Sequence, residues 1–566
     1  MMSPSLGNNS LTHFDVLIIG SGAGGSAAAE MLTRLGKKVL ILEAGSNYFE
    51  KLDDPHFENI KTKFSNDEVK MTRRNLIQPD PLTEPRTFRP NAKKIRTFVG
   101  DVNHLPKTVG GGSVHADMKT PRFHPDDFKM ASYLGEVAGA NFADWPIEYD
   151  QLEKFYCHME SILGVQGKEN ATPFDPPRSK PYPMPPGVPM LVGLLGAEGA
   201  SKLGYHPFPY PTAVNSRPYD GRPACVDCGF CSAYGCPSSA KGSAAVTALR
   251  RALLTGRCLL LSETRVQDLL KKGSQIVGVR ALDPEGKPVV FEADQYILAA
   301  SPIEDARLLL LSDPGGSGIG NSNGLVGKNL MFHFQTYAIG IFNRRLHTHR
   351  GRAVTHGILD FRGSPRDKTR PLGGIVEIGG EGNPIDEAIN YSSSVGIKGR
   401  LLKKFMVESP LRDRLMALIM QGEDAPQLTN SVDLDPDYRD IDGLPVARAT
   451  YKNHHFELSA KKYYSPKLLD VIGAAGAAYG FIAPENKPAT SRHIMGTLRF
   501  GNDPKTSVCD AQGRLHELDN LYVADGSLFP TSSGLNPTLT IMALASRVAA
   551  SMVFPNAPER GLPISS

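Results

Sequence analysis

The pattern of apolar and polar positions near the start of the chain predicts a strand, a helix and a second strand in close succession. An apolar run begins at Phe14 and leads into a glycine-rich turn, which is followed by a helical stretch that ends before Gly36. A second apolar run, from Lys38 to Leu42, is followed directly by the acidic residue Glu43. This order is typical of a dinucleotide-binding unit. We therefore expect the chain to open with a Rossmann-like α/β domain.

The glycine turn has the spacing that a bound dinucleotide requires. Gly20, Gly22 and Gly25 form G-x-G-x-x-G, in which glycines let the backbone approach a pyrophosphate at the N-terminus of the helix. Glu43 lies where an acid would hydrogen-bond a ribose hydroxyl. An acid at this position disfavours a 2′-phosphate, so NAD or FAD is the expected cofactor.

The pattern near the other end of the chain predicts a second part of a site. His493 precedes a Gly-Thr turn, a short strand LYVADGS follows, and an apolar helix runs from Leu539 to Val553. Asn536 is a good N-cap and Pro537 a good first helical residue, so the helix should begin there. A helix N-terminus carries partial positive charge and free N–H groups. It would suit an anion or the electron-rich edge of a reduced flavin.

Between these ends, the pattern indicates two further regions. The segment Cys258 to Ser312 is expected to be a strand-rich excursion that returns to the sheet. The segment Met331 to Arg492 should form a substrate lobe, with strand-like runs and one helix-like run: Tyr337–Phe342, Gly373–Ile378 and Leu411–Met420, the last being the helical one. The proline-rich stretch within Pro173 to Pro223 should be an extended loop on the surface or over a cleft.

Composition excludes some classes of protein. The chain has 566 residues, with 63 basic and 59 acidic side chains, so its net charge of +4 does not favour nucleic acid as a partner. No apolar run approaches the roughly 20 residues of a membrane span, and residues 1–14 show no export signal. Seven cysteines without an evident pairing fit a reducing compartment. We expect the cytoplasm, or the periplasm only by export with a signal-bearing partner.

Several motifs, taken in order along the chain, match one family. They are Thr108–Ser113 (TVGGGS), Asp144–Ile147 with Tyr149, Glu263–Val266, Tyr296–Ala300 with Arg307–Leu310, and Val326–Leu330. With the dinucleotide unit and the His493 segment, they make the chain resemble the glucose-methanol-choline (GMC) flavoprotein oxidoreductases. Among these it is most similar to gluconate or sugar dehydrogenase-like and pyranose oxidase-like members.

The resemblance implies a fold and a cofactor. It implies an FAD-binding domain of about residues 11–130, 225–330 and 490–555. This domain would be intergrown with a substrate-binding domain of about residues 131–224 and 331–489, built on an antiparallel sheet with helices. The implied FAD-binding residues are Gly20, Gly22, Gly25, Glu43, Gly110, Gly111, Ser113, His115, Val266, Ala300, Asp525, Gly526, Asn536, Pro537 and Thr538. Some members bond the flavin covalently through a histidine spaced like His115, although an ordinary packing or hydrogen-bonding role also fits an imidazole there.

The resemblance also implies two catalytic residues. His493 would accept the hydroxyl proton of an alcohol, because an imidazole titrates near neutral pH. Asn536 cannot take a proton and would orient the substrate oxygen. Without the family motifs, His493 could simply end a strand and Asn536 could simply cap its helix. The other histidines are expected to be surface or structural residues: His13, His104, His124, His333, His454 and His455.

Four cysteines lie in one short segment, Cys225, Cys228, Cys231 and Cys236. Their spacing, C-x2-C-x2-C-x4-C-P, is one residue longer than the bacterial ferredoxin pattern. An iron–sulfur cluster that relays electrons is one interpretation. A structural loop with packed thiols is another, and a zinc site or a disulfide is a third.

Three functions remain at this stage. The first is an FAD-dependent dehydrogenase that acts on a polyol, sugar, sugar acid or glycoside and passes electrons to a quinone, cytochrome or partner subunit. The second is an oxidase that uses dioxygen on a long-chain or steroid alcohol, and the third is a flavoprotein that oxidises no alcohol. Pro173–Pro223 and Thr348–Asn390 are rich in glycine, proline and charge, which favours a polar substrate.

Overall fold

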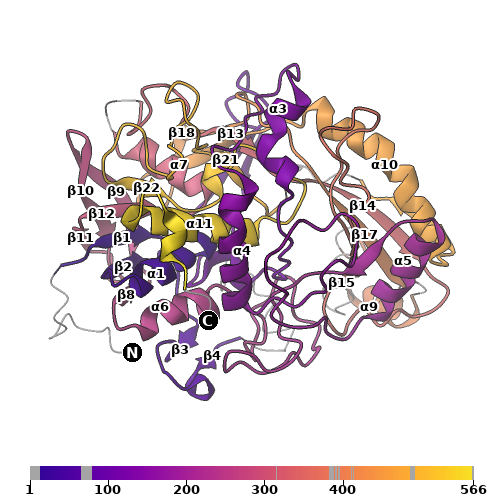
Figure 1. Ribbon diagram of the computed structural model, residues 1–566. Coiled ribbons are helices and arrows are strands. Elements are labelled where there is room, and N and C mark those ends of the chain that lie inside the picture. Colours follow the sequence, from indigo (N-terminus) through magenta and orange to yellow (C-terminus); the bar gives the residue numbers. More distant parts are fainter. Residues whose placement is uncertain are drawn as a thin grey trace.

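The computed structural model describes residues 13–64, 79–313, 315, 317–380, 388, 392, 396–409, 411, 413–484 and 491–563. In Figure 1 the sheet that contains β1 and β2 lies on one side of the molecule with α1 and α11. The strands β14, β15 and β17 lie on the other side with α5 and α10. The predicted domain boundaries near residues 11 and 490 fall outside the described residues. So do residues 1–12, where the sequence predicts no export signal.

A five-stranded parallel sheet forms the core of the first half. Its strand order is β22-β12-β1-β2-β8, with β1 at the centre. Every residue of β1 and β2 is buried, as expected for parallel strands that are covered on both faces. The bounds are β22 Leu521–Val523, β12 Gln295–Leu298, β1 Val16–Ile19, β2 Val39–Leu42 and β8 Cys258–Leu261. The predicted strand–helix–strand unit is confirmed.

Two helices from opposite ends of the chain cover this sheet. Helix α1 (Ala23–Arg34) follows the glycine turn, and α11 (Thr538–Val553) packs beside it with most of its residues buried. Glycine permits the close approach of α1, because a Cβ on Gly24 would lie 1.8 Å from the carbonyl oxygen of Ala524. The N-terminal unit and the C-terminal segment therefore share one core.

A six-stranded antiparallel sheet forms the second half, in the order β20-β14-β17-β16-β15-β7. Helices α5 (Leu191–Lys202) and α10 (His455–Ala474) pack against it. The strands are β20 Tyr479–Ile482, β14 Phe334–Ile341, β17 Leu415–Gly422, β16 Val376–Gly379, β15 Val354–Ile358 and β7 Pro207–Pro209. The α/β fold with a parallel sheet and an antiparallel sheet is confirmed, and the binding of substrate by this second half stays a prediction.

One predicted helix is wrong. The run Leu411–Met420 was expected to be helical, but it contributes strand β17. Met416, Leu418 and Met420 are buried while the residues between them are partly exposed, so the burial has the period of two that a strand requires. Pairing with β14 on one side and β16 on the other fixes this conformation. The other two predicted runs do contain strands, β14 and β16.

Two further sheets and one hairpin complete the fold. A mixed six-stranded sheet has the order β21-β13-β18-β19-β5-β6, and a three-stranded sheet has the order β11-β10-β9. These strands are β21 Met495–Thr497, β13 Lys328–Met331, β18 Ser431–Arg439, β19 Pro445–Thr450, β5 Arg86–Arg89, β6 Phe98–Gly100, β11 Pro288–Phe291, β10 Gln275–Leu282 and β9 Arg265–Lys272, beside the hairpin β3 Phe49–Glu50 and β4 Lys61–Thr62. The strand-rich excursion over Cys258–Ser312 is confirmed.

The other helices are short, apart from α4, which runs between the two halves in the view of Figure 1. They are α3 Met130–Leu134, α4 Tyr149–Leu163, α6 Arg250–Leu254, α7 Pro302–Leu311 and α9 Gly399–Glu408. Within the described residues, we find no helix whose length and apolar character would let it cross a membrane.

Candidate active site

Two histidines face each other where the two halves of the molecule meet. His493 precedes β21, and His333 lies between β13 and β14. Their Nδ1 atoms are 2.9 Å apart, and their rings cross at 80°. His333 is buried and its Nε2 lies 3.0 Å from the carbonyl oxygen of Ser532, whereas His493 is only half-buried. His333, which the sequence groups with surface or structural histidines, is therefore part of the site.

Asn536 lies beside His493 and is held by two buried partners. Its Nδ2 donates to Oε1 of Glu377 at 2.9 Å, and its Oδ1 accepts from the hydroxyl of Tyr210. The same Nδ2 lies 3.5 Å from Nε2 of His493. The N-cap prediction for Asn536 is wrong, because α11 begins at Thr538 with Pro537 in the cap position and without a side-chain cap. The Asn536 amide is directed to His493 instead.

A buried group of charges supports Asn536. Glu377 is 1% exposed and accepts from Nζ of Lys119 at 2.7 Å and from Gln421 at 3.1 Å. Lys119 also pairs with Asp117 at 2.9 Å. Burial lowers the pKa of Lys119, but Asp117 and Glu377 outweigh it and raise that pKa above its ordinary value. Lys119 is therefore a fixed positive charge near the two histidines.

The surroundings keep both histidines neutral. Burial, together with His333 and Lys119, lowers the pKa of His493 well below its ordinary value. Burial lowers the pKa of His333 to about 4, although its hydrogen bond to Ser532 opposes the shift. A neutral imidazole has one bare nitrogen that can accept a proton. The pair thus has the protonation state that a base requires at neutral pH.

Two glycine loops meet at the N-terminus of α1. Gly20 has a left-handed φ of 99°, and a Cβ on Gly111 would lie 2.8 Å from Cα of Gly22. Among the described residues, no side chain caps the N-terminus of α1 at Gly22. Uncapped N–H groups beside side-chain-free backbone suit a pyrophosphate. These residues therefore fit a dinucleotide.

Glu43 lies at the end of β2, next to this turn. Its carboxylate accepts from the N–H of Ser21 at 3.0 Å, from the Ser21 hydroxyl at 2.6 Å and from the N–H of Gly45 at 2.8 Å. The Ser21 hydroxyl in turn accepts from the N–H of Gly110 at 3.1 Å. Glu43 thus ties the first glycine turn to the second. Its predicted ribose contact remains a prediction.

The other predicted cofactor residues come from several elements. Ser113 donates to the carbonyl of Gly110 at 2.6 Å and accepts from Ala244 at 2.9 Å. Asp525 accepts from the N–H of Ser301 at 2.8 Å, directly after β12, so it joins the carboxyl ends of β22 and β12. The remaining ones are Ala300 after β12, Gly526 after Asp525, Val266 in β9, His115 after the second glycine loop, and Pro537 and Thr538 at the start of α11.

The four-cysteine segment packs against the second glycine loop. The N–H of Ala233 donates to the carbonyl of His115 at 3.0 Å. The buried amine of Lys241 donates to the carbonyls of Cys231 and Tyr234, each at 2.8 Å. None of the four cysteines forms a disulfide bond in this structure, which therefore does not support the disulfide interpretation.

The spacing of the cysteine sulfurs does not favour the zinc interpretation, which stays a prediction. A zinc ion holds its ligands at about 2.0–2.3 Å, so its ligand atoms must lie within a few ångströms of one another. Within the described part of the chain, the group that meets a spacing of 4.8 Å is His347, His349 and Asp413. The cysteine sulfurs do not reach that spacing. The spacing leaves room for a wider iron–sulfur cluster or a structural loop.

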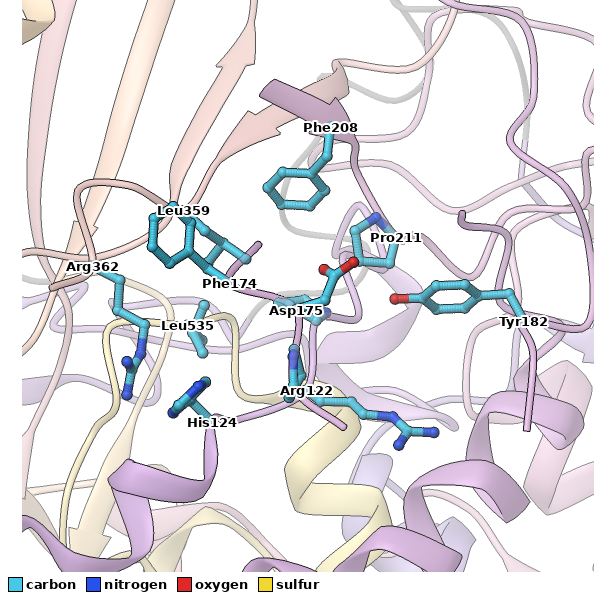
Figure 2. A pocket seen from close by; sticks show the side chains of 12 residues that line it. Arg122, His124, Phe174, Asp175, Tyr182, Phe208, Pro211, Leu359, Arg362 and Leu535 are labelled. Atoms are coloured by element: carbon cyan, nitrogen blue, oxygen red, sulfur yellow. The ribbon is translucent and has the colours of Figure 1, made fainter. Parts of the chain in front are cut away.

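A pocket is lined by Leu535, the residue before Asn536, and by Phe208 (Figure 2). Its lining combines apolar side chains with charged ones: Pro121, Arg122, His124, Phe174, Asp175, Pro176, Tyr182, Phe208, Pro211, Leu359, Arg362 and Leu535. Phe208 stacks on Tyr210, which is bonded to Asn536. The proline-rich segment supplies Phe174 to Pro176 and Tyr182, so its predicted place over a cleft is confirmed.

The protein joins a dinucleotide-binding sheet to an antiparallel lobe, and a neutral histidine pair lies at their junction. This arrangement is typical of a two-domain oxidoreductase that uses a nucleotide cofactor. Models of the GMC oxidoreductase family match residues 196–335 and 426–545. Residues 15–78 also match the pyridine nucleotide-disulphide oxidoreductase model. The chain belongs to the GMC oxidoreductase family, which confirms the resemblance.

Three relatives are each 30% identical to the chain. They are 2-methyl-1,2-propanediol dehydrogenase of Mycolicibacterium austroafricanum (94% of both chains), paromamine 6'-oxidase of Streptomyces fradiae (95% of this chain and 90% of the relative) and the fructose dehydrogenase large subunit of Gluconobacter japonicus (96% and 98%). A solved structure, pyridoxine 4-oxidase from Mesorbium loti, is 18% identical with a TM-score of 0.63 and covers 96% of this chain and 99% of its own. The fold is the same.

Proposed function

We propose that the protein oxidises a CH–OH group of a polyol, sugar, sugar acid or glycoside to the carbonyl, with FAD as its cofactor. When bound, FAD supplies the acceptor for the hydride that leaves the alcohol carbon. The observation that carries the proposal is the position of the neutral His493, whose Nε2 lies 3.5 Å from the fixed amide of Asn536. The related propanediol and fructose dehydrogenases support a hydroxyl-bearing substrate.

We expect the following groups of the chain to hold FAD. The N-terminus of α1 with Gly20 and Gly22 would receive the pyrophosphate, and Glu43 would receive a ribose hydroxyl. The second glycine loop, with Ser113 and His115, and the start of α11, with Asn536 to Thr538, would receive the flavin. Val266, Ala300, Asp525 and Gly526 complete the lining.

His493 and Asn536 divide the work on the hydroxyl group. An oxygen placed beside both side chains can accept a hydrogen bond from Nδ2 of Asn536 and donate its proton to Nε2 of His493. Glu377 and Tyr210 hold the two ends of the amide, so Asn536 cannot rotate and its second N–H stays on the side of His493. Asn536 positions the oxygen, and His493 takes the proton.

A panel of alcohols tests the proposal. We expect the purified protein to be yellow and to lose its colour without oxygen when a polyol or sugar is added. The matching deoxy compounds are the control and should leave the colour unchanged. Comparing an artificial dye with dioxygen as acceptor separates a dehydrogenase from an oxidase. A yellow protein that no alcohol, sugar or long-chain alcohol bleaches contradicts the proposal.

The charge of Lys119 should set the pH range of activity. The active form of His493 is neutral, so kcat/KM falls as the pH drops through its pKa, which lies below the ordinary 6.5. Lys119→Met removes a positive charge that lowers this pKa and leaves Asp117 and Glu377 to raise it. We expect the acid limb of the profile to move up by roughly one pH unit.

A pH profile of kcat/KM checks this shift. Lys202→Met is the matched control, because Lys202 is exposed and pairs with Glu198 on α5. Its profile should match the wild type. An acid limb that stays in place or moves down in Lys119→Met contradicts the electrostatic account.

Iron content separates two interpretations of the cysteine segment. An iron–sulfur relay requires iron and acid-labile sulfide in the purified protein, and Cys231→Ser would lose both together with electron transfer to the acceptor. A structural loop requires neither, and Cys231→Ser would then still be bleached by alcohol. The contacts of this segment with His115 support a role beside the cofactor in either case.

A further inference from the structure

We propose that His333 is a positioning residue that holds His493 in the tautomer with its hydrogen on Nδ1, so that Nε2 is the proton acceptor. The inference rests on the proposed function, because it specifies which atom of the base receives the alcohol proton. It follows from an unbroken chain of hydrogen bonds between His493, His333 and the backbone of Ser532.

The chain starts at the carbonyl of Ser532, which can only accept. Nε2 of His333 lies 3.0 Å from this oxygen, so Nε2 must carry a hydrogen. His333 is 1% exposed, and burial favours its neutral form, which has a single N–H. Nδ1 of His333 is therefore a bare acceptor.

The hydrogen bond between the two histidines determines the tautomer of His493. The two Nδ1 atoms are 2.9 Å apart, a distance that needs one hydrogen between them. Because Nδ1 of His333 is bare, His493 supplies that hydrogen from its own Nδ1. A neutral His493 then has its lone pair on Nε2, the atom that faces Asn536. The opposite tautomer would bring two lone pairs together at the same distance.

Hydrogen bonds to the backbone hold the two histidines beside each other, although they are 160 residues apart in the sequence. The hydroxyl of Ser491 accepts from the N–H of His333 and from the N–H of His493, each at 3.1 Å. Ser532 is fully buried, and its hydroxyl accepts from the N–H of Asp424 at 2.8 Å. Asp424 also accepts from the N–H of Phe332, the residue before His333.

The groups around the pair add one more feature. The partner of His333 is a carbonyl, which carries no net charge, and the positive Lys119 lowers the pKa of His493. The hydrogen bond that His493 donates from Nδ1 therefore ends on an imidazole and not on a carboxylate, unlike in a Ser-His-Asp triad. The pair directs the proton acceptor without raising its pKa.

Two variants test the proposal. His333→Leu removes the acceptor, so we expect kcat to fall roughly 10- to 100-fold with KM and the flavin spectrum unchanged. His333→Asn restores an acceptor oxygen close to Nδ1 and should recover most of that loss. If the Asn variant is no more active than the Leu variant, or if both equal the wild type, the positioning role is wrong.

The tautomer can also be read directly from the holoenzyme without substrate. In protein labelled with ¹⁵N-histidine, with the His493 signals assigned by their loss in His493→Gln, we expect hydrogen on Nδ1 in the wild type and a shift towards Nε2 in His333→Leu. Hydrogen on Nε2 in the wild type overturns the inference. Because this readout needs no turnover, it stands even if the alcohol proposal fails.

Discussion

Gly25→Ala should yield a colourless protein. A Cβ at this position would lie 2.0 Å from the carbonyl oxygen of Gly20 and 3.2 Å from Cγ2 of Ile18. The first of these atoms belongs to the backbone of the glycine turn, so it cannot move aside without opening the turn or lifting α1 from β1. The N-terminus that would hold the pyrophosphate is displaced in either case. The ratio of flavin to protein absorbance measures the loss.

Gly473→Ala is the matched control for this substitution. Gly473 also lies in a helix, α10, but a Cβ there meets nothing within 4 Å. This variant should keep its colour and gain about 0.5–1 kcal/mol in free energy of unfolding, because alanine favours a helix over glycine. Normal flavin content in Gly25→Ala would contradict the assignment of the glycine turn to FAD.

His493→Ala should lower turnover with an alcohol roughly 10²- to 10⁴-fold, the range that a general base contributes. Asn536 cannot replace it, because an amide takes no proton, and neither can Tyr210, because burial raises the pKa of its phenol well above the ordinary value. The carboxylate of Glu377 already accepts from Lys119, Gln421 and Asn536. The flavin content should not change, since the glycine turn and α1 lie elsewhere. Steady-state assays with an artificial dye measure the effect.

His13→Ala serves as the control for a histidine substitution. His13 pairs with Asp294 on the surface and has a side chain that is 65% exposed. Its turnover should equal that of the wild type. Comparable turnover in His493→Ala and His13→Ala would remove His493 from the chemistry.

Local motifs made the cofactor half of the molecule predictable. The glycine turn, its flanking strands and Glu43 lie within about 30 residues of sequence, so the order of residues alone defines the unit. His493 and Asn536 lie near each other in the chain as well, and the fold brings them together as the family resemblance implies. The position of the proline-rich loop over a pocket followed from its composition.

The rest of the site depends on tertiary contacts that no motif marks. His333, Glu377, Lys119 and Tyr210 come from four separate segments, and only the folded sheets bring them to Asn536 and His493. Of the buried pair Lys119–Glu377, only Glu377 could have been suspected, from its place within the apolar run Ile375–Ile378. The sequence alone does not show which residues of distant segments will lie opposite each other in the folded sheets.

Two errors have the same physical origin. Leu411–Met420 is too short and too apolar for periodicity to separate a strand from a helix, and its neighbours in the sheet decided the outcome. Asn536 has the local preference of an N-cap, but Glu377 and Tyr210 offer its amide better partners than the free N–H groups of α11. Tertiary structure overrode local preference at both places.

The most direct test of the account is a single turnover without oxygen. Wild-type protein and His493→Ala, each with its flavin oxidised, are mixed with a polyol or sugar that bleaches the wild type, and the flavin absorbance is followed. This isolates the step at the alcohol from transfer to the acceptor. We predict that the wild type loses its colour and that the variant stays yellow over the same period. Bleaching of the variant at the wild-type rate would contradict the account.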